Sequence, residues 1–311
     1  MLIGLPKEIK DNESRVGLTP ESVKKLISQG HEVLVETDAG FGSGFSDGDY
    51  IHFGARILKK PKEVFENAEL IIKVKEPQSA EVNLLKPDQL LFTYLHLAAN
   101  KNLTQCLMDS QSTCIAYETV TSSSNSLPLL APMSEVAGKI SIQAGARALE
   151  KTQHGRGVLM SGAYGAPPAD VVIIGCGVVG FNAALIAVGM KANVILIDKS
   201  EPRLSELYKF FEGKVTTVVS SKSEVEKYVS NCDLLIGGVL VPGSSAPKLV
   251  SKKLVSKMRK GSAIVDVAID QGGCIETSKP TTHSEPTYIY KDVVHYCVTN
   301  MPGCVPRTST I

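Results

Sequence analysis

The sequence predicts an α/β protein with two doubly wound parallel sheets and a cleft between the two domains. Three observations lead to this fold class. Short apolar runs alternate with helical patterns along the chain, which is typical of βαβ units and a mainly parallel sheet. Several of these runs are apolar throughout, as expected of strands covered on both faces. The chain has 311 residues, a length that suits about two domains of ordinary size.

The first domain is expected over residues 1–130. Leu2 to Leu5 is predicted as its first strand, and Thr19-Pro20-Glu21 supplies an N-cap, a first-turn proline and a first-turn acid for the next helix. Gly30 is expected to end that helix. Further strands are predicted at Glu32 to Thr37, Leu70 to Lys75, Leu90 to Leu97 and Cys114 to Glu118, with helices near Pro61 to Asn67 and Leu103 to Ser110.

The second domain is expected over residues 131–300. A helical pattern from Met133 to about Gln153 enters it, and a loop rich in Gly, Ala and Pro follows from Ser161 to Ala169. The alternation of strands and helices then restarts. Strands are predicted at Val171 to Ile174, Val194 to Ile197, Thr216 to Ser220, Leu234 to Ile236 and Ala263 to Val267, with helices at Gly180 to Met190 and Arg203 to Phe211.

Charge and composition argue against several classes of protein. The 33 Lys and Arg residues nearly balance the 32 Asp and Glu residues, so no general attraction to nucleic acid or anionic membranes is expected. No apolar run approaches the length of a membrane span. The seven cysteines form no C-x-x-C pair, which argues against a zinc site or a disulfide framework. The first residues lack the pattern of a secretory signal, so a cytoplasmic location is expected.

A glycine-rich segment, Gly175-Cys-Gly-Val-Val-Gly180, lies directly between a predicted strand and a predicted helix. Gly175 permits a tight turn, Gly177 permits a pyrophosphate to approach the backbone, and Gly180 permits close helix packing. The N-terminus of the following helix attracts the phosphates. These features predict a Rossmann dinucleotide site. The alternative is a glycine-rich turn that only packs.

Asp198, at the end of the next predicted strand, suits a ribose 2′-hydroxyl and repels a 2′-phosphate, so NAD is favoured over NADP. Lys199 and Arg203 lie nearby and weaken that preference, because either could pair with a phosphate. Cys176, inside the glycine-rich segment, is interpreted as a small buried residue rather than a redox group.

Two polar side chains close neighbouring strands of the first domain, Lys75 and His96. Ligands of an open parallel sheet bind beyond the carboxyl ends of its strands, so both are expected in one crevice with Arg15 from the loop after the first strand. An Arg binds a carboxylate bidentately, a Lys holds a carboxylate or carbonyl oxygen, and a His shuttles protons. The set suits a small keto or amino acid. Taken singly, these residues could instead be a core histidine, a strand-edge lysine and a solvated loop cation.

Asp270 in the second domain follows the apolar strand that begins at Ala263 and precedes a Gly-Gly turn. It is expected near a nicotinamide, where a carboxylate could orient or activate water. The alternative is an Asp that caps the turn. The remaining histidines, at positions 31, 52, 154, 283 and 295, have no comparable placement and are interpreted as surface or structural residues.

Seven motifs along the whole chain resemble the alanine dehydrogenase family, which shares its fold with the nucleotide-binding subunit of proton-translocating transhydrogenase. They are Pro-Lys-Glu-Ile-Lys followed by Arg15-Val-Gly-Leu-Thr-Pro, Lys75-Glu-Pro, His96-Leu-Ala, Leu130-Ala-Pro-Met-Ser134-Glu-Val-Ala-Gly, the glycine-rich segment, Val239-Leu-Val-Pro-Gly and Asp270-Gln-Gly-Gly. The transhydrogenase relative lacks the His96 motif, which favours the dehydrogenase.

The resemblance implies the reversible conversion of L-alanine to pyruvate and ammonium with NAD. It implies that Arg15 and Lys75 bind the substrate and that His96 and Asp270 are catalytic. Hydride would leave the alanine Cα for the cofactor, and water would add to the resulting iminium with His96 as general base, assisted by Asp270. The positions assigned to the cofactor site are Ser134, Gly175, Gly177, Val178, Val179, Gly180, Asp198, Arg203, Ser220, Val239, Leu240, Val267, Ala268, Ile269, Asp270, Lys279, Val298, Thr299, Asn300 and Met301.

The resemblance also assigns roles to the domains. Residues 1–130 would bind substrate, residues 131–300 would bind NAD, and residues 301–311 would start a segment that returns to the first domain. Family members are commonly homohexamers, and their chains continue with helices that complete the first domain. Because this sequence stops at Ile311, two alternatives stay open: a catalytically impaired NAD(H)-binding structural or regulatory protein, and a transhydrogenase-like subunit. No metal, nucleic-acid or membrane partner is expected.

Overall fold

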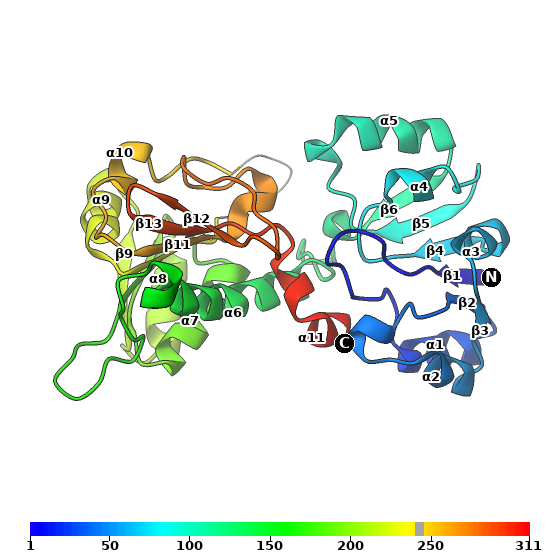
Figure 1. Cartoon of the computed structure of the whole chain (residues 1–311), viewed down its shortest axis with the longest axis horizontal. Helices are drawn as coiled ribbons and strands as arrows, with labels where there is room; N and C mark the ends of the chain where they lie inside the picture. The colour runs from blue at the N-terminus through cyan, green and yellow to red at the C-terminus, as the bar shows by residue number, and fades with distance from the viewer. Residues whose placement is uncertain (240–245) are drawn as a thin grey trace. The chain divides into compact units, whose positions relative to one another are not determined.

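The computed structural model describes residues 1–239 and 246–311. The chain divides into two compact units, unit 1 with Met1–Pro132 and Pro302–Ile311, and unit 2 with Met133–Met301. Unit 1 therefore contains both the first and the last residues of the chain, drawn in blue and red in Figure 1.

Unit 1 is built on a six-stranded parallel sheet. Its strands are β1 (Leu2–Leu5), β2 (Glu32–Glu36), β3 (Arg56–Leu58), β4 (Leu70–Ile72), β5 (Leu90–Thr93) and β6 (Thr113–Ala116). Their order across the sheet is β3-β2-β1-β4-β5-β6, and every neighbouring pair is parallel. This is the doubly wound order 3-2-1-4-5-6, in which the chain reverses direction across the sheet between β1 and β4. The predicted α/β fold class is confirmed for this unit.

Helices lie on both sides of the unit 1 sheet (Figure 1). They are α1 (Pro20–Ser28), α2 (Asp47–His52), α3 (Pro61–Asn67), α4 (Ser79–Val82), α5 (Lys101–Ser110) and α11 (Pro306–Thr310), with 3-10 turns η1 (Phe41–Ser43), η2 (Leu97–Ala99) and η3 (Tyr117–Thr119). Helix α1 begins as predicted, because the Thr19 side chain accepts a hydrogen bond from the Ser22 amide. One apolar core contains Ile3 and Leu5, and a second contains Ile71 and Leu91.

Unit 2 repeats the doubly wound order. Its strands are β7 (Asp170–Ile174), β8 (Asn193–Asp198), β9 (Val215–Val219), β10 (Leu234–Gly237), β11 (Ala263–Asp266), β12 (Thr287–Tyr290) and β13 (Val293–Tyr296). The order across the sheet is β12-β13-β11-β10-β7-β8-β9, and only the edge strand β12 is antiparallel to its neighbour among these strands. The second predicted Rossmann-like domain is therefore confirmed, with its direction change between β7 and β10.

The unit 2 sheet is also covered on both faces. Its helices are α6 (Ala131–Ala148), which begins at the end of the first segment of unit 1, α7 (Val178–Gly189), α8 (Glu201–Phe210), α9 (Lys222–Asn231) and α10 (Lys252–Val255), with 3-10 turns η4 (Lys151–Gln153) and η5 (Val267–Gln271). A further 3-10 turn, η6 (Met301–Cys304), begins at the last residue of unit 2 and continues into unit 1. Successive strand residues point to opposite faces. Leu235 joins the core beneath α9 and α10, whereas the Leu234 side chain lies against Gly145 of α6.

The predicted helix from Met133 to Gln153 is wrong at its end. Helix α6 stops at Ala148, and the chain folds back across the helix terminus. The Gly155 amide donates to the Glu150 carbonyl, and a Cβ at Gly155 would lie 2.3 Å from the Ala148 carbonyl oxygen. The helical period therefore continues in the sequence, but the fold-back at Gly155 prevents the helix from continuing.

None of the helices within residues 1–239 and 246–311 combines the length and the apolar character that crossing a bilayer requires.

His295 on β13 is fully buried and should make the stability of unit 2 depend on pH. Its Nδ1 donates to the Val293 carbonyl at 3.0 Å, so its Nε2 accepts from the Thr277 hydroxyl at 2.7 Å. Burial lowers the pKa of His295 below its ordinary value of 6.5. At pH values between this lowered pKa and about 6.5, the unfolded chain therefore binds more protons than the folded chain. Stability is lost as the pH falls below about 6.5.

We expect the free energy of unfolding to decrease between about pH 7 and pH 5. In His295→Gln the number of protons taken up on unfolding should be smaller by about one, so the dependence on pH should be weaker. Urea unfolding at several pH values measures both. His52→Gln, at an exposed position on α2, is the control and should keep the wild-type slope. An unchanged slope in His295→Gln would contradict the assignment.

Candidate functional site

The carboxyl ends of the parallel strands form the edge at which open α/β sheets bind ligands, especially where the strand order reverses. In unit 1 this place lies between β1 and β4, and in unit 2 it lies between β7 and β10. The loop after β1 carries Arg15, the chain after β4 carries Lys75, and the loop after β7 carries the glycine-rich segment. Arg15, Lys75 and the glycine-rich segment therefore follow strands that adjoin these two points, whereas His96 follows β5 and Asp270 follows β11.

The glycine-rich segment has the geometry that a dinucleotide loop needs. Gly175 has φ +90°, a conformation that side chains disfavour. A Cβ at Gly180 would lie 1.9 Å from the Gly175 carbonyl oxygen, so only glycine allows α7 to start this close to β7. A Cβ at Gly177 would meet nothing within 4 Å, and Gly177 is the N-cap of α7. Space is thus left open over the first amides of the helix.

Asp198 and Arg203 hold the backbone of this loop. Asp198 Oδ2 accepts from the Cys176 amide at 2.7 Å, and Oδ1 accepts from the Ser200 amide at 2.9 Å. Arg203 Nε donates to the Cys176 carbonyl at 3.0 Å, and its Nη1 pairs with Glu206 at 2.8 Å. Burial raises the pKa of the Cys176 thiol to about 12. That thiol is therefore protonated at neutral pH, as expected of a packing residue.

The other predicted cofactor positions of unit 2 mostly follow the same edge of its sheet. Ser220 follows β9, Val239 follows β10, and Val267, Ala268, Ile269 and Asp270 form η5 after β11. Val298, Thr299, Asn300 and Met301 follow β13. Ser134 lies in α6, and the Lys279 amide donates to the Tyr288 hydroxyl. Leu240 lies outside the described residues. The cofactor roles of these positions stay predictions.

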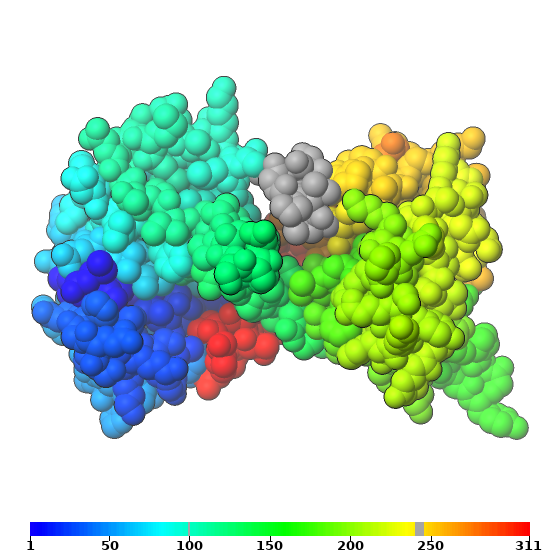
Figure 2. Space-filling view, turned by 180° about the vertical axis from the view of Figure 1, so that it is seen from behind, coloured from blue at the N-terminus to red at the C-terminus, as the bar shows by residue number. Residues whose placement is uncertain are grey.

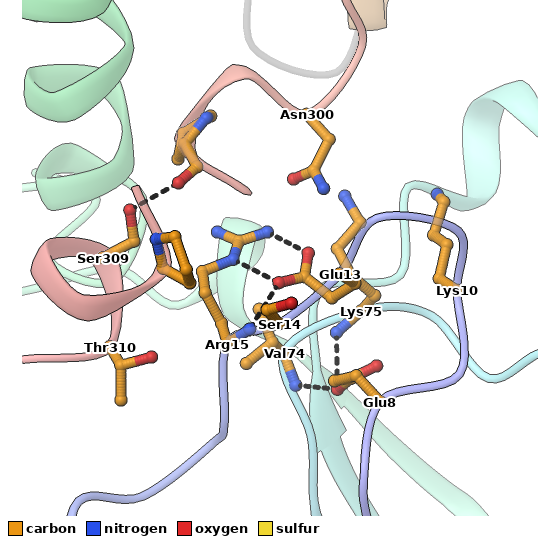
Figure 3. Close-up of polar contacts among 12 residues, drawn as sticks. Glu8, Lys10, Glu13, Ser14, Arg15, Val74, Lys75, Asn300, Ser309 and Thr310 are labelled. Carbon is orange, nitrogen blue, oxygen red and sulfur yellow. Dashed lines mark hydrogen bonds and ion pairs between the residues drawn. The ribbon is translucent and has the colours of Figure 1, made fainter. Parts of the chain in front are cut away.

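Arg15 is buried rather than solvated, with 3% of its surface exposed. Its Nε and Nη2 donate to the two carboxylate oxygens of Glu13, at 2.8 Å and 2.6 Å, and its amide donates to Glu13 as well (Figure 3). Arg15, Glu13 and Glu8 line a cavity of about 180 Å³ in unit 1. The interpretation of Arg15 as a solvated loop cation is therefore wrong.

Lys75 is likewise buried, with 6% of its surface exposed. It follows β4, which lies inside the sheet between β1 and β5, so the alternative of a strand-edge lysine is wrong. The predicted strand from Leu70 to Lys75 ends at Ile72, because the Val74 and Lys75 amides donate to the Glu8 carboxylate. A side chain from the loop after β1 thus replaces the continuation of the strand.

His96 lies at the end of the neighbouring strand, β5. The predicted strand from Leu90 to Leu97 ends at Thr93, and the Leu95 and His96 amides donate to the Glu118 carboxylate. His96 has φ +49°, a left-handed conformation, and its ring stacks on Tyr94 with 5.9 Å between centroids. The half-buried imidazole is therefore held by its backbone and by an aromatic neighbour.

The last residues of the chain pack against the Arg15 loop. The Thr310 hydroxyl contacts the Ser43 hydroxyl at 2.8 Å and accepts from the Val16 amide at 3.3 Å. Arg307 Nη1 donates to the Ser43 and Gly44 carbonyls, and its guanidinium lies over the Phe45 ring. In Figure 2 this red segment is seen against the blue residues of unit 1.

Several buried carboxylates around the predicted site of unit 1 were not predicted. Glu8 and Glu81 pair with Lys73, Glu13 pairs with Arg15, and Glu118 holds the backbone at His96. Glu8 and Glu13 stand close to Arg15 in the sequence, which was an available signal. No such signal exists at Glu81 and Glu118, because a single sequence does not distinguish a buried Glu from a surface Glu. Within the described parts of the chain, no cluster of three His, Cys, Asp or Glu side chains is arranged to hold a metal ion.

Two Rossmann-like units, one with a dinucleotide loop and one with buried cations at its ligand-binding edge, define the class of two-domain nucleotide-dependent dehydrogenases. Residues 4–137 match the model of the alanine dehydrogenase/PNT N-terminal domain, and residues 141–311 match that of the C-terminal domain. The chain belongs to the alanine dehydrogenase/PNT family.

Individual relatives agree with this membership. The alanine dehydrogenase of Halomonas elongata is 56% identical over 310 residues, which cover 100% of this chain and 84% of the relative. That of Methanococcus maripaludis is 55% identical and covers 100% of this chain, with 83% of the relative matched. A solved L-alanine dehydrogenase has a TM-score of 0.95 and 54% identity over 100% of this chain and 86% of its own.

A transhydrogenase from Sinorhizobium meliloti has a TM-score of 0.87 and 23% identity, over 100% of this chain and 89% of its own. At that identity the likeness concerns the fold alone.

Proposed function

We propose that this chain catalyses the reversible oxidative deamination of L-alanine to pyruvate and ammonium, with NAD as the cofactor. The observation that carries the proposal is the placement of Lys75 and His96 after two neighbouring parallel strands, with Arg15 after the adjacent β1. The percentage identity to alanine dehydrogenases supports the same reaction. On this proposal, unit 1 binds the substrate and unit 2 binds NAD.

The glycine-rich segment fits a dinucleotide. The open space at Gly177 allows a pyrophosphate to reach the backbone, and the amides at the start of α7 point toward negative charge. Asp198 uses two of its roughly four acceptor positions on the Cys176 and Ser200 amides. The remaining positions suit a ribose hydroxyl, and the carboxylate repels a 2′-phosphate, which supports NAD over NADP. When bound, NAD accepts a hydride from the amino-acid Cα and NADH returns it to the imine.

Arg15 and Lys75 are assigned to the oxygens of the substrate. Both are buried cations at the ligand-binding edge of unit 1, and burial strengthens their attraction for a carboxylate or a carbonyl oxygen. The bidentate bond to Glu13 fixes the plane of the Arg15 guanidinium. The Arg15 guanidinium therefore has a fixed orientation, and the two cations attract the oxygens of an incoming oxo acid.

His96 is assigned to proton transfer. Its left-handed backbone and its stacking on Tyr94 hold the ring at one place, as a general base or acid requires. It takes a proton from water that adds to the imine, and gives it back in the reverse direction. Asp270, exposed in η5, is assigned to orienting that water. A homohexameric assembly, implied by the family resemblance, and a cytoplasmic location belong to the same proposal.

The test is the oxidation of NADH by the purified chain with pyruvate and ammonium, followed by NADH absorbance. We expect turnover that needs both pyruvate and ammonium, and slower turnover with NADPH. Binding of NADH without turnover would overturn the proposal and favour a non-catalytic NAD(H)-binding protein. Light scattering on the same sample measures the assembly.

A further inference from the structure

The main chain of Lys75 is held from both sides by buried side chains. On the β1 side, Glu8 Oε1 accepts from the Val74 amide at 2.6 Å and from the Lys75 amide at 3.2 Å (Figure 3). On the β5 side, the Thr93 hydroxyl donates to the Lys75 carbonyl at 2.8 Å. The amide and the carbonyl of Lys75 are therefore both fixed by side chains, one from the loop after β1 and one from the end of β5.

This arrangement is not needed to end a strand, because ordinary loops reach water for the same purpose. Here neither partner reaches water, since 3% of the Glu8 side chain is exposed and Thr93 is fully buried. Here a buried carboxylate accepts hydrogen bonds from two backbone amides, where a neighbouring strand would otherwise accept them. Such a carboxylate fixes the direction of the backbone at that point. The direction of the Lys75 side chain follows from it.

Burial raises the pKa of the Glu8 carboxyl, and the neighbouring Lys73 opposes that rise. Its ammonium donates to Glu8 at 3.0 Å and to Glu81 at 2.6 Å, and it is fully buried. Lys73 therefore offsets the negative charge of Glu8, and its ammonium is ion-paired with two carboxylates. Of the two lysines in Lys73-Val-Lys75, the first is enclosed by Glu8 and Glu81, whereas the second follows the strand end and has Glu76 3.9 Å from its ammonium.

We propose that Glu8 and Thr93 are positioning residues that clamp the main chain of Lys75 and so set the place of its ammonium against the substrate. This inference rests on the proposed function of Lys75 in binding the oxo acid. The clamp acts on substrate affinity and leaves the cofactor site untouched, because Glu8 and Thr93 both belong to unit 1 and the glycine-rich segment belongs to unit 2.

Glu8→Gln is the first variant, because it keeps the size of the side chain but has one acceptor oxygen, which cannot serve both the two peptide N–H groups and the Lys73 ammonium. We expect the KM for pyruvate to rise by about 10- to 100-fold, the range that a displacement of about 1 Å brings. The Kd for NADH, measured by fluorescence titration without substrate, should not change. Glu81→Gln is the matched control: it breaks the other ion pair of Lys73 and leaves the Val74 and Lys75 amides bonded.

Thr93→Val is the second variant, since it is nearly isosteric and touches no ion pair. It should raise the KM for pyruvate in the same direction, whereas Thr93→Ser keeps the hydroxyl and should stay near wild type. If Glu8→Gln fails to fold, the Thr93 pair still decides the matter. Unchanged KM values in Thr93→Val, or equal increases in Glu8→Gln and Glu81→Gln, would overturn the clamp.

A readout that needs no turnover separates this inference from the proposed function. Acetic anhydride labels accessible lysine amines, and peptide mass spectrometry gives the rate at Lys75. We expect faster labelling of Lys75 in Glu8→Gln and Thr93→Val and a wild-type rate in the two controls. A wild-type chain without activity on pyruvate would reject the proposed function, while the labelling rates would still decide whether Lys75 is clamped.

Discussion

Replacing His96 with asparagine is expected to lower kcat in both directions by about 10²- to 10⁴-fold, the usual contribution of a positioned acid or base. Asparagine is the better choice than alanine here. His96 has φ +49°, a left-handed conformation that asparagine tolerates and alanine disfavours. The variant should therefore keep the backbone bond to Glu118 and the fold of the β5 end. Because His96 belongs to unit 1, the Kd for NADH should stay at its wild-type value.

NADH absorbance gives kcat for this variant, and fluorescence titration gives the Kd. His52→Asn makes the same exchange at the exposed end of α2 and should leave both values unchanged. Wild-type turnover in His96→Asn would remove His96 from proton transfer. A loss of NADH binding together with turnover would point instead to a general loss of structure.

Two alanine substitutions in the glycine-rich segment are expected to have different effects, one on stability and the other on NADH binding. Gly180→Ala puts a methyl group 1.9 Å from the Gly175 carbonyl oxygen, so α7 or β7 must move, at a cost of about 3 kcal/mol or more. Gly177→Ala meets nothing within 4 Å and has an ordinary φ of −70°. It should leave the melting temperature unchanged but weaken NADH binding by about tenfold or more, because the methyl group keeps the pyrophosphate from the backbone.

Thermal unfolding and NADH titration of the two variants distinguish these effects. Gly189→Ala at the end of α7 is the control, because it also meets nothing within 4 Å but lies at the far end of the helix from the loop. It should raise stability by up to about 1 kcal/mol and leave NADH affinity unchanged. Tight NADH binding by Gly177→Ala would show that the pyrophosphate binds elsewhere.

Much of the fold follows from local patterns. Thr19, Pro20 and Gly30 mark the ends of α1 at the predicted places, and the apolar runs mark most of the parallel strands. The short or half-exposed elements were missed. In β12 the residues alternate between exposed and half-buried, so no buried face appears in the sequence. Strand β3 has only the three residues Arg56–Leu58, too few for a period to show.

The ends of β4 and β5 show why the site was harder to predict than the fold. Val74 continues an alternating pattern past Ile72, and the apolar residues Tyr94 and Leu95 continue the pattern past Thr93, so the sequence predicts longer strands. The Lys73 and Tyr94 amides still bond to backbone carbonyls between the two strands. The following amides donate instead to Glu8 and Glu118, which lie at least 66 and at least 22 positions away in the chain. A hydropathy pattern indicates which residues are buried. It does not record which distant side chain bonds to its backbone.

The return of the chain to unit 1 has a consequence for how the protein is made. The Val16 amide, next to Arg15, bonds to Thr310, which the ribosome adds 294 positions later. Domains generally fold as they emerge during synthesis, N-terminal first. Unit 2 is complete at residue 301, before α11 exists. The loop after β1 is therefore translated early, yet its bond to Thr310 can form only after all of unit 2 has been synthesised.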